Sequence, residues 1–417
     1  MTGPGCLRLL LVVLAASLSA MGLPAGAAPS LSRQQLPESP AFDPARYNPA
    51  VLRIGFSEKG AVAGASATSA LLDLTLIPAE GEVQGYRLEV PLARFNNLLR
   101  QLYGQLAKQA PMDVNDPSSP ARQLYDILLK PVTPDLERLG VTTLLLSADA
   151  GLQAVPYAAL HDGRTYFGER YALGLTPALG LTRLDAVPTL VKARTLASGA
   201  SVFRGLAPLP LVPQELERLE SASAADRFLN QTFTPSVLLE RAGDPAFQRV
   251  HVATHAEFLP GGPAKARLQT GTAPMGLREL SQLRQRRGDT QLDVFTLSAC
   301  RTALGDPDTE LGFAGLALQA GSRSAIGSLW YVDDVATSAL MVQFYRYLDQ
   351  GIPKAEALQL TRQAMASGRM RLEGDRVLGA DNSVLLSALT PAEQRRISAG
   401  LQHPFFWSGI NLLGNPW

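Results

Sequence analysis

Strand-length apolar runs that alternate with helix-length segments constrain the fold of this chain more than any other feature. Residues 141–147 form a mainly apolar run, typical of a strand that is buried on both faces of a sheet. Further strands are predicted at residues 70–77, 86–90, 250–254, 292–297 and 324–329. Helices are predicted at residues 92–106, 121–129, 277–286 and 312–320, after Thr234-Pro235, and from Asp334 onward. This alternation predicts an α/β fold with a mostly parallel sheet that helices cover on both faces.

The size and charge of the chain exclude several classes of protein. Its 417 residues are enough for one large α/β unit or for two fused halves. A hydrophobic content of 46% with 18% charged residues is that of a globular protein. The net charge of +1 and the lack of a long Lys/Arg run argue against a nucleic-acid partner. The sequence has no repeat of about 34 residues, so it does not predict a tetratricopeptide array.

The N-terminus has the pattern of a secretory signal peptide. Arg8 precedes an apolar run over residues 9–16, and residues 25–27 form a small-residue cleavage site. The alternative is an uncleaved membrane anchor, but polar residues and Pro24 interrupt the run before it reaches the ~20 apolar residues that span a bilayer. We expect cleavage after Ala27 and an exported protein, periplasmic or extracellular, with no further membrane span.

Residues 28–50 are rich in Pro, Ser and Gln and are expected to be a linker that follows the signal peptide. The first strand is expected to begin near Val51.

The chain has two cysteines, Cys6 and Cys300. Cys6 lies ahead of the apolar run, so it is removed if the signal peptide is cleaved. The mature chain would then carry one thiol and no internal disulfide. A single cysteine in an exported protein is a candidate reactive thiol, and the alternative is a buried, inert side chain.

Reactive side chains follow two of the predicted strands. His255 comes directly after residues 250–254, and Cys300 lies just beyond residues 292–297. Because functional groups gather at the carboxyl ends of parallel strands, we expect the two side chains to be neighbours. A thiol with a pKa of ~8.5 is mostly protonated at neutral pH, and an adjacent imidazole favours the reactive thiolate. The backbone N–H groups of Ala256 and Cys300 are candidates for the oxyanion hole.

Two other interpretations of these residues remain open. Taken singly, a histidine at a strand end is most often a structural residue, and a lone cysteine is most often inert. A metal site with His251, His255 and Cys300 as ligands is a further alternative. The four-residue spacing of the histidines falls on a predicted strand rather than on a helix, which disfavours that alternative. The sequence therefore predicts no metal and no cofactor.

An ordered series of motifs resembles the CHAT domain, the caspase-like domain that is often attached to tetratricopeptide repeats. The histidine motif corresponds to residues 251–255 (HVATH) and the cysteine motif to residues 297–303 (LSACRTA). Similar segments stand at residues 155–163, 169–171, 320–334, 344–345 and 403–407. The resemblance extends from about residue 69 to the C-terminus.

The resemblance implies a caspase-haemoglobinase fold in which His255 is the general base and Cys300 the nucleophile. It also implies two parts of one CHAT domain: an N-terminal, pseudo-caspase-like half over residues 51–190 and a catalytic half over residues 191–417. The chain departs from the family where Ala256 replaces the glycine that usually follows the histidine. Alanine keeps the N–H but disfavours positive φ, so activity would be weakened if the oxyanion hole needs that conformation.

The segment that ends in Asp334 resembles the part of separase, a related peptidase, that supplies an acidic residue to bind a basic substrate side chain. By this resemblance Asp334 would favour Arg or Lys before the cleaved bond. The alternative is that Asp334 caps the helix that follows.

Two hypotheses of function follow from these residues. The first is an exported thiol protease, a caspase-like cysteine endopeptidase that hydrolyses protein or peptide substrates, with activation by a partner as one option. The second is a non-catalytic binding or scaffold protein with the same fold. The reactivity of Cys300 distinguishes the two.

Overall fold

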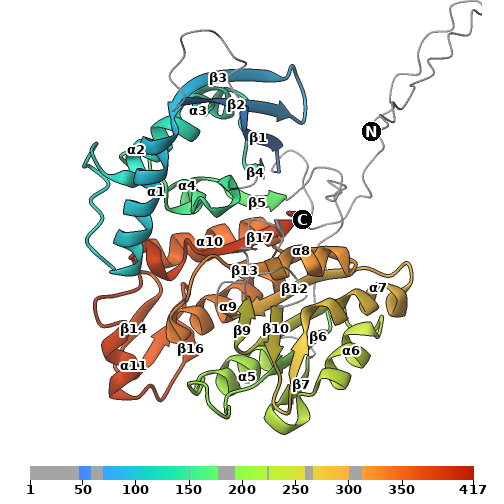
Figure 1. Cartoon of the computed structure of the whole chain (residues 1–417). Helices are drawn as coiled ribbons and strands as arrows, with labels where there is room; N and C mark the ends of the chain where they lie inside the picture. The colour runs from blue at the N-terminus through green and yellow to red at the C-terminus, as the bar shows by residue number, and fades with distance from the viewer. Residues whose placement is uncertain are drawn as a thin grey trace, which may run out of the picture. The chain divides into compact units, whose positions relative to one another are not determined.

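The computed structural model describes residues 47–57, 69–149, 151–176, 193–222, 225–258, 266–299 and 312–417. Figure 1 shows these residues as ribbons coloured along the chain. The predicted signal peptide, both cysteines and the predicted boundary between the two halves at residues 190 and 191 lie outside this part of the chain.

Within the described residues a central sheet has eleven strands in the order β3-β2-β1-β4-β5-β17-β13-β12-β8-β6-β7 (Figure 1). Five come from the first half: β1 (Pro49–Ser57), β2 (Ser69–Pro78), β3 (Gln84–Pro91), β4 (Thr143–Ala148) and β5 (Ala172–Thr176). Six come from the second half: β6 (Thr195–Gly199), β7 (Ala225–Leu229), β8 (Arg249–Ala253), β12 (Leu292–Ser298), β13 (Ser322–Ser328) and β17 (Ile410–Gly414).

Neighbouring strands of the central sheet are parallel except at three places. The pairs β1–β2, β2–β3 and β13–β17 are antiparallel. The strand β17, from the end of the chain, lies between β5 and β13 and so joins the strands of the two halves in one sheet. The predicted α/β fold with a mostly parallel sheet is confirmed.

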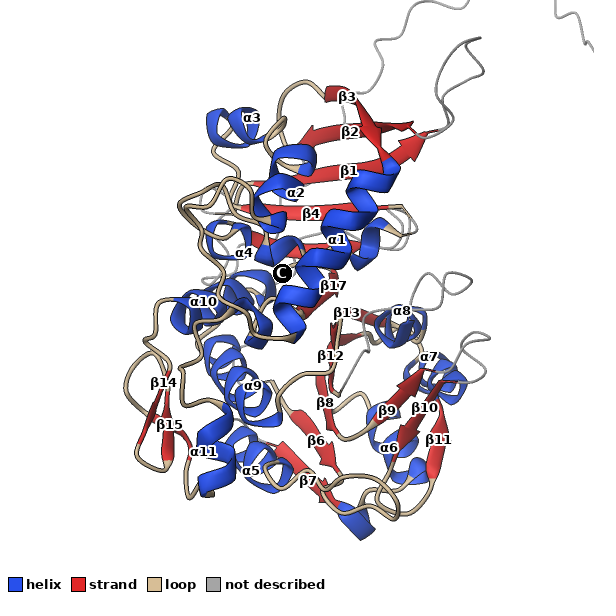
Figure 2. Ribbon diagram, turned by 60° about the vertical axis from the view of Figure 1, so that its left-hand side comes forward, coloured by secondary structure: helices blue, strands red, loops and turns tan. Residues whose placement is uncertain are grey.

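The helices of the first half are α1 (Leu92–Ala107), α2 (Pro120–Leu128), α3 (Thr133–Arg138) and α4 (Phe167–Arg170). In Figure 2 they lie on one face of the strands β1 to β4. The buried residues of α1 recur every three or four positions, at Phe95, Leu98, Leu102 and Leu106, as expected for a helix that packs one stripe on a sheet. The opposite face of β1 and β3 carries exposed residues such as Arg53 and Arg87.

The second half carries helices on both faces of the sheet. They are α5 (Val212–Ala222), α6 (Pro235–Gly243), α7 (Gln282–Arg287), α8 (Gly312–Gln319), α9 (Asp334–Asp349), α10 (Lys354–Ala366) and α11 (Pro391–Arg396). Alternate residues of one strand face different cores: Val294 of β12 belongs to the core that contains α9 and α10, and Phe295 to the core that contains α6 and α7. This alternation is what a strand buried on both faces requires.

Two small sheets complete the fold. One consists of β9 (Ala256–Phe258), β10 (Ala266–Gln269) and β11 (Pro274–Gly276), in the order β11-β10-β9. The other consists of β14 (Arg371–Glu373), β15 (Arg376–Leu378) and β16 (Val384–Leu386). No helix within the described ranges is long and apolar enough to cross a membrane.

The predicted cap of the long helix α9 was wrong by one residue. Asp333, not Asp334, is the N-cap: its backbone is extended and its carboxylate accepts a hydrogen bond from Ala336 N. Either of two consecutive aspartates can cap, and the sequence does not decide between them. Helix α3 was not predicted, and the predicted helix at 277–286 begins as a 3-10 helix (Leu277–Ser281) before α7.

A buried cluster of charges lies at the amino ends of β8 and β12. The guanidinium of Arg249, fully buried, contacts Asp349 at 2.7 Å. The ammonium of Lys354, also buried, contacts Asp293 at 2.6 Å, and Asp293 lies 3.9 Å from Arg249. The two cations and two carboxylates thus compensate one another's charge where water is excluded. Their contacts link β8 and β12 to α9 and α10.

Removing one member of this cluster should destabilise the folded protein. We expect Arg249→Leu to lower the free energy of unfolding by about 3–5 kcal/mol, since it leaves the Asp349 carboxylate buried beside no cation. Urea unfolding followed by circular dichroism measures this. The control is Arg194→Leu, which removes an exposed pair with Asp226 and should cost at most about 1 kcal/mol. An equal decrease in the free energy of unfolding in the two variants would contradict the stabilising role of the buried charge cluster.

Candidate functional site

His255 lies where β8 leaves the central sheet. Thr254, just after β8, still donates its backbone N–H to Ser298 O of β12 at 3.3 Å, and the chain then turns into β9 of the small sheet. The imidazole of His255 is held from the side by the loop that follows β6. Its Nε2 lies 2.8 Å from the carbonyl oxygen of Ala207, and its ring centroid lies 4.6 Å from that of Phe203.

The contact with Ala207 fixes the tautomer of His255. A carbonyl oxygen only accepts hydrogen bonds, so Nε2 must carry the hydrogen. The other ring nitrogen, Nδ1, is then the one with a free lone pair when the ring is neutral. The contact with Ala207 therefore leaves Nδ1 as the acceptor nitrogen of the neutral ring.

The strands β8 and β12 precede His255 and Cys300 in the sequence. The strands are parallel neighbours, with Thr296 opposite His251 and Ser298 opposite Ala253. Each strand ends two residues before the predicted site residue, β8 at Ala253 and β12 at Ser298. Cys300 itself lies outside the described residues, so its contacts with His255 are not given by the structure. The described residues confirm that the two strands that lead to the predicted pair are adjacent.

A cavity of about 40 Å³ lies against His255. The central sheet contributes Thr254, Ser298 and Ala299, and the loop before α5 contributes Leu209. The remaining lining residues come from α5, from α9 and from the residues just before α9: Val212, Glu215, Val332, Asp334, Thr337 and Ser338. The cavity thus has two carboxylates, and none of these lining residues is a lysine or an arginine.

Glu215 lines the cavity and is a residue that the sequence analysis did not single out. Its side chain is buried, with Oε1 2.8 Å from Nε2 of His251 and Oε2 accepting from the hydroxyl of Ser338 at 2.6 Å. A signal was present in the sequence: Glu215 lies on the same helical stripe as Val212, Leu216 and Leu219, all of which are buried. A carboxylate on a core-facing stripe needs a partner, and the sequence did not reveal which one.

His251 has a structural environment. It is fully buried within β8, its Nε2 is engaged by Glu215, and its ring meets that of Tyr345 edge-on at 5.3 Å. Within the described ranges no group of three His, Cys, Asp or Glu side chains is arranged to hold a metal. That search does not reach Cys300, so the His251, His255 and Cys300 alternative stays a hypothesis.

Asp334 lies at the first position of α9 and lines the cavity with His255. Its carboxylate forms an ion pair with Arg396 of α11, and Arg396 also lies 3.3 Å from Asp333. Burial raises the pKa of Asp334, while the positive charge of Arg396 acts in the opposite direction. The interpretation of Asp334 as the helix cap is wrong, because Asp333 is the cap, and its role in binding a basic side chain stays a prediction.

Ala256, the residue that departs from the usual glycine, is in strand β9 opposite Leu268 of β10. It is not one of the described non-glycine residues with positive φ, which are Gln109, Asn230, Asn382 and Ala388. Alanine therefore adopts its observed backbone conformation without strain.

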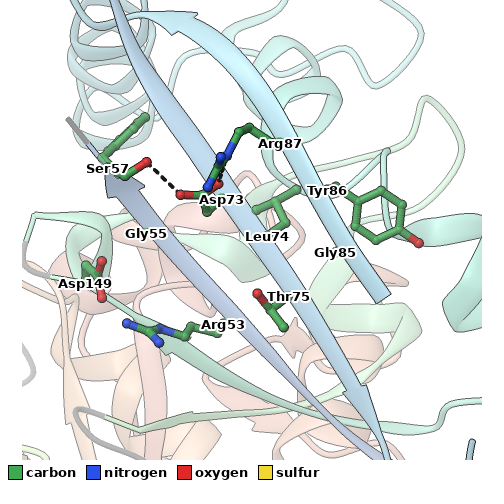
Figure 3. Close-up of a pocket in the computed structure, with 11 residues that line it drawn as sticks. Arg53, Gly55, Ser57, Asp73, Leu74, Thr75, Gly85, Tyr86, Arg87 and Asp149 are labelled. Carbon is green, nitrogen blue, oxygen red and sulfur yellow. Dashed lines mark hydrogen bonds and ion pairs between the residues drawn. The ribbon is translucent and has the colours of Figure 1, made fainter. Parts of the chain in front are cut away.

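A larger hollow of about 590 Å³ lies elsewhere, on the open face of β1, β2 and β3 (Figure 3). Asp73 is at its centre and accepts from Arg87 Nε at 2.6 Å and from Ser57 Oγ at 2.7 Å. These two contacts lower the pKa of Asp73. No histidine or cysteine is present among the described residues that line the hollow.

The model of the CHAT domain matches residues 118–415, and the chain belongs to this family. The match covers both strands that lead to His255 and Cys300, as well as Asp334. The class of protein that fold and sequence define is therefore the caspase-like peptidase fold. No curated protein matches the chain.

Solved structures with a similar fold include two of the separase–securin complex of Saccharomyces cerevisiae. Each has a TM-score of 0.46, with 9% and 10% identity, and covers 89% of this chain. This chain spans only 30% of the length of those chains. The Arg-specific cysteine proteinase gingipain R is also similar, with a TM-score of 0.41 and 13% identity over 69% of this chain and 66% of that chain. The complex of the pro- and mature domains of the Porphyromonas gingivalis protein RgpB has a TM-score of 0.39 and 12% identity over 71% of each chain.

Proposed function

We propose that this chain is an exported caspase-like cysteine endopeptidase in which His255 activates Cys300. The observation that carries the proposal is the parallel pairing of β8 with β12, in which Ala253 and Ser298, each two residues before a predicted site residue, are opposite each other. The contact of His255 with Ala207 supports it, because it leaves Nδ1 as the nitrogen that can accept a proton.

The proposed reaction has two steps. Nδ1 of His255 takes the proton of the Cys300 thiol, and the thiolate attacks the carbonyl carbon of the substrate peptide bond. The imidazolium then gives its proton to the leaving amine as the C–N bond breaks, which leaves a thioester. Water, deprotonated by His255, hydrolyses the thioester and restores the thiol. The backbone N–H groups of Ala256 and Cys300 are proposed to stabilise the negative oxygen in both steps.

The substitution of glycine by Ala256 does not favour the non-catalytic alternative. The concern was that an oxyanion hole requires a conformation that alanine avoids. Ala256 has the extended backbone of a β-strand, which alanine and glycine adopt equally. The departure from the family therefore gives no conformational reason to expect lost activity.

The cavity beside His255 supports a preference for a basic side chain. Two carboxylates line it, Asp334 and Glu215, and none of its described lining residues is a lysine or an arginine. Their described partners, Arg396 and His251, lie outside the lining. Its volume of about 40 Å³ has room for roughly three water molecules, which is close to the size of a guanidinium group. We propose that the head of an Arg or Lys side chain enters this cavity, with Asp334 as its principal acceptor.

Exposed apolar side chains near the site support an extended peptide as substrate. Val202 is 69% exposed and Leu206 is 36% exposed, and both belong to the loop that holds His255. Tyr331, 68% exposed, lies beside Val332 of the cavity wall. Large apolar side chains in water commonly mark binding surfaces, and these three flank the proposed site of cleavage on two loops.

The chain from Ala28 to the C-terminus should cleave fluorogenic peptides with Arg or Lys before the reporter group. We expect no cleavage of the matching Asp peptide, since its carboxylate would meet Asp334 and Glu215. His255→Ala should lower kcat/KM by about 10²–10⁴, the usual contribution of a general base. Circular dichroism of that variant controls for folding. The assay is repeated with added cellular extract, which would supply an activating partner. Failure to cleave any peptide under both conditions would favour the scaffold alternative.

Export and the division into halves are also part of the proposal. We propose a signal peptide over residues 1–27, a linker over residues 28–50, and CHAT-domain halves over residues 51–190 and 191–417. N-terminal sequencing of the protein recovered outside the producing cytoplasm should begin at Ala28. Recovery of the chain with its original N-terminus in the membrane fraction would contradict this and indicate an anchor.

A further inference from the structure

A module formed by β14, β15, β16 and α11, residues 371–396, contacts both helices that carry the carboxylates of the cavity. Toward α5, Gln214 donates to Ser387 O at 2.9 Å and accepts from Ser387 N at 2.6 Å. Gln214 immediately precedes Glu215. This link joins the module to one wall of the cavity.

The module contacts α9 at several points along its length. Gln343 Oε1 accepts from Ala380 N at 3.0 Å, and Arg346 donates to Val384 O at 3.1 Å. At the start of α9 the contact is electrostatic, because Arg396 pairs with both Asp333 and Asp334. The module therefore holds the second wall of the cavity as well.

Arg396 occupies a defined place at the end of α11. The helix is capped by Thr390, whose hydroxyl accepts from Glu393 N while the Glu393 carboxylate accepts from Thr390 N at 2.7 Å. Arg396 does not itself line the cavity, although Asp334 does. It reaches Asp334 through Oδ1, and a carboxylate has a second oxygen that can serve another donor.

We propose that Arg396 is a positioning residue for cation recognition: it holds the Asp334 carboxylate at the cavity wall, so that the cavity binds the guanidinium or ammonium head of a ligand side chain. The inference rests on the proposed function, because the side chain that enters the cavity is taken to belong to a peptide substrate. The binding of the cation itself does not require Cys300 or cleavage.

The physical reason is the position of Asp334. Asp333 and Asp334 are adjacent and repel each other, and Arg396 lies against both. Burial raises the pKa of Asp334, so without Arg396 the carboxylate is drawn toward the neutral acid or toward solvent. In neither case does it attract a cation in the cavity. Two carboxylates and one guanidinium still leave net negative charge at this wall, so Arg396 does not cancel the attraction.

The test compares two labelled peptides that differ only in charge: one ends in arginine amide, the other in citrulline amide, which has the same shape without the charge. Binding is measured by fluorescence polarisation to the Cys300→Ser chain, which cannot cleave them. We expect the arginine peptide to bind about tenfold more tightly, in the range of a partly buried charge pair. Arg396→Ala should abolish this difference, as should Asp334→Asn.

Arg395 provides a matched control, because it is exposed on the same helix turn and pairs with none of the described carboxylates. Arg395→Ala should keep the tenfold difference. Arg396→Lys, which retains the charge, should restore part of it. If Arg396→Ala does not fold, Arg396→Gln keeps hydrogen-bond donors near both carboxylates and is expected to lose the difference.

The outcomes separate this inference from the proposed peptidase activity. If Arg396→Ala keeps the preference for arginine, or binds the arginine peptide more tightly, Arg396 is not a positioning residue and the inference is overturned. If the chain cleaves peptides without distinguishing arginine from citrulline, the inference fails and the peptidase proposal stands. If the arginine preference is present and depends on Arg396 but no peptide is cleaved, the inference holds and the peptidase proposal fails.

Discussion

The parallel pairing of β8 with β12 is the interaction on which the rest of the site depends. It aligns Ala253 with Ser298 at the carboxyl edge of the sheet, and a shift by one residue would pair side chains that point to opposite faces. The buried charges of Arg249, Asp293, Asp349 and Lys354 lie at the other end of the same two strands. They tie the strands to α9 and α10, and since buried charges tolerate few arrangements, they oppose such a shift.

From that edge the site is assembled by elements that are distant in the sequence. The loop after β6 orients His255 through Ala207, α5 brings Glu215, and α9 brings Asp334. Each of these elements contributes a different part of the wall of the same cavity. The side chains of His255, Glu215 and Asp334 thus line one cavity while separate contacts stabilise each of them.

Much of this fold could be predicted from the sequence because its strongest signals are local. Apolar strand runs and helical stripes predicted the alternation of elements, and the adjacency of the two strands that precede His255 and Cys300 is confirmed. The contacts that the sequence did not reveal join residues far apart along the chain. Ser338 and Glu215 are separated by 123 positions, and Arg396 and Asp334 by 62. No periodicity predicts such pairs, and the choice between Asp333 and Asp334 as cap depends on the same tertiary contacts.

The measurement that tests the central claim most directly is the rate of alkylation of Cys300 as a function of pH. The chain that begins at Ala28 has no other cysteine, so the signal comes from a single thiol. The pairing of β8 and β12 predicts rapid modification well below pH 8.5, and His255→Ala should return the profile to that of an ordinary thiol. Slow modification that is unchanged in His255→Ala would contradict the dyad and leave Cys300 as an inert cysteine.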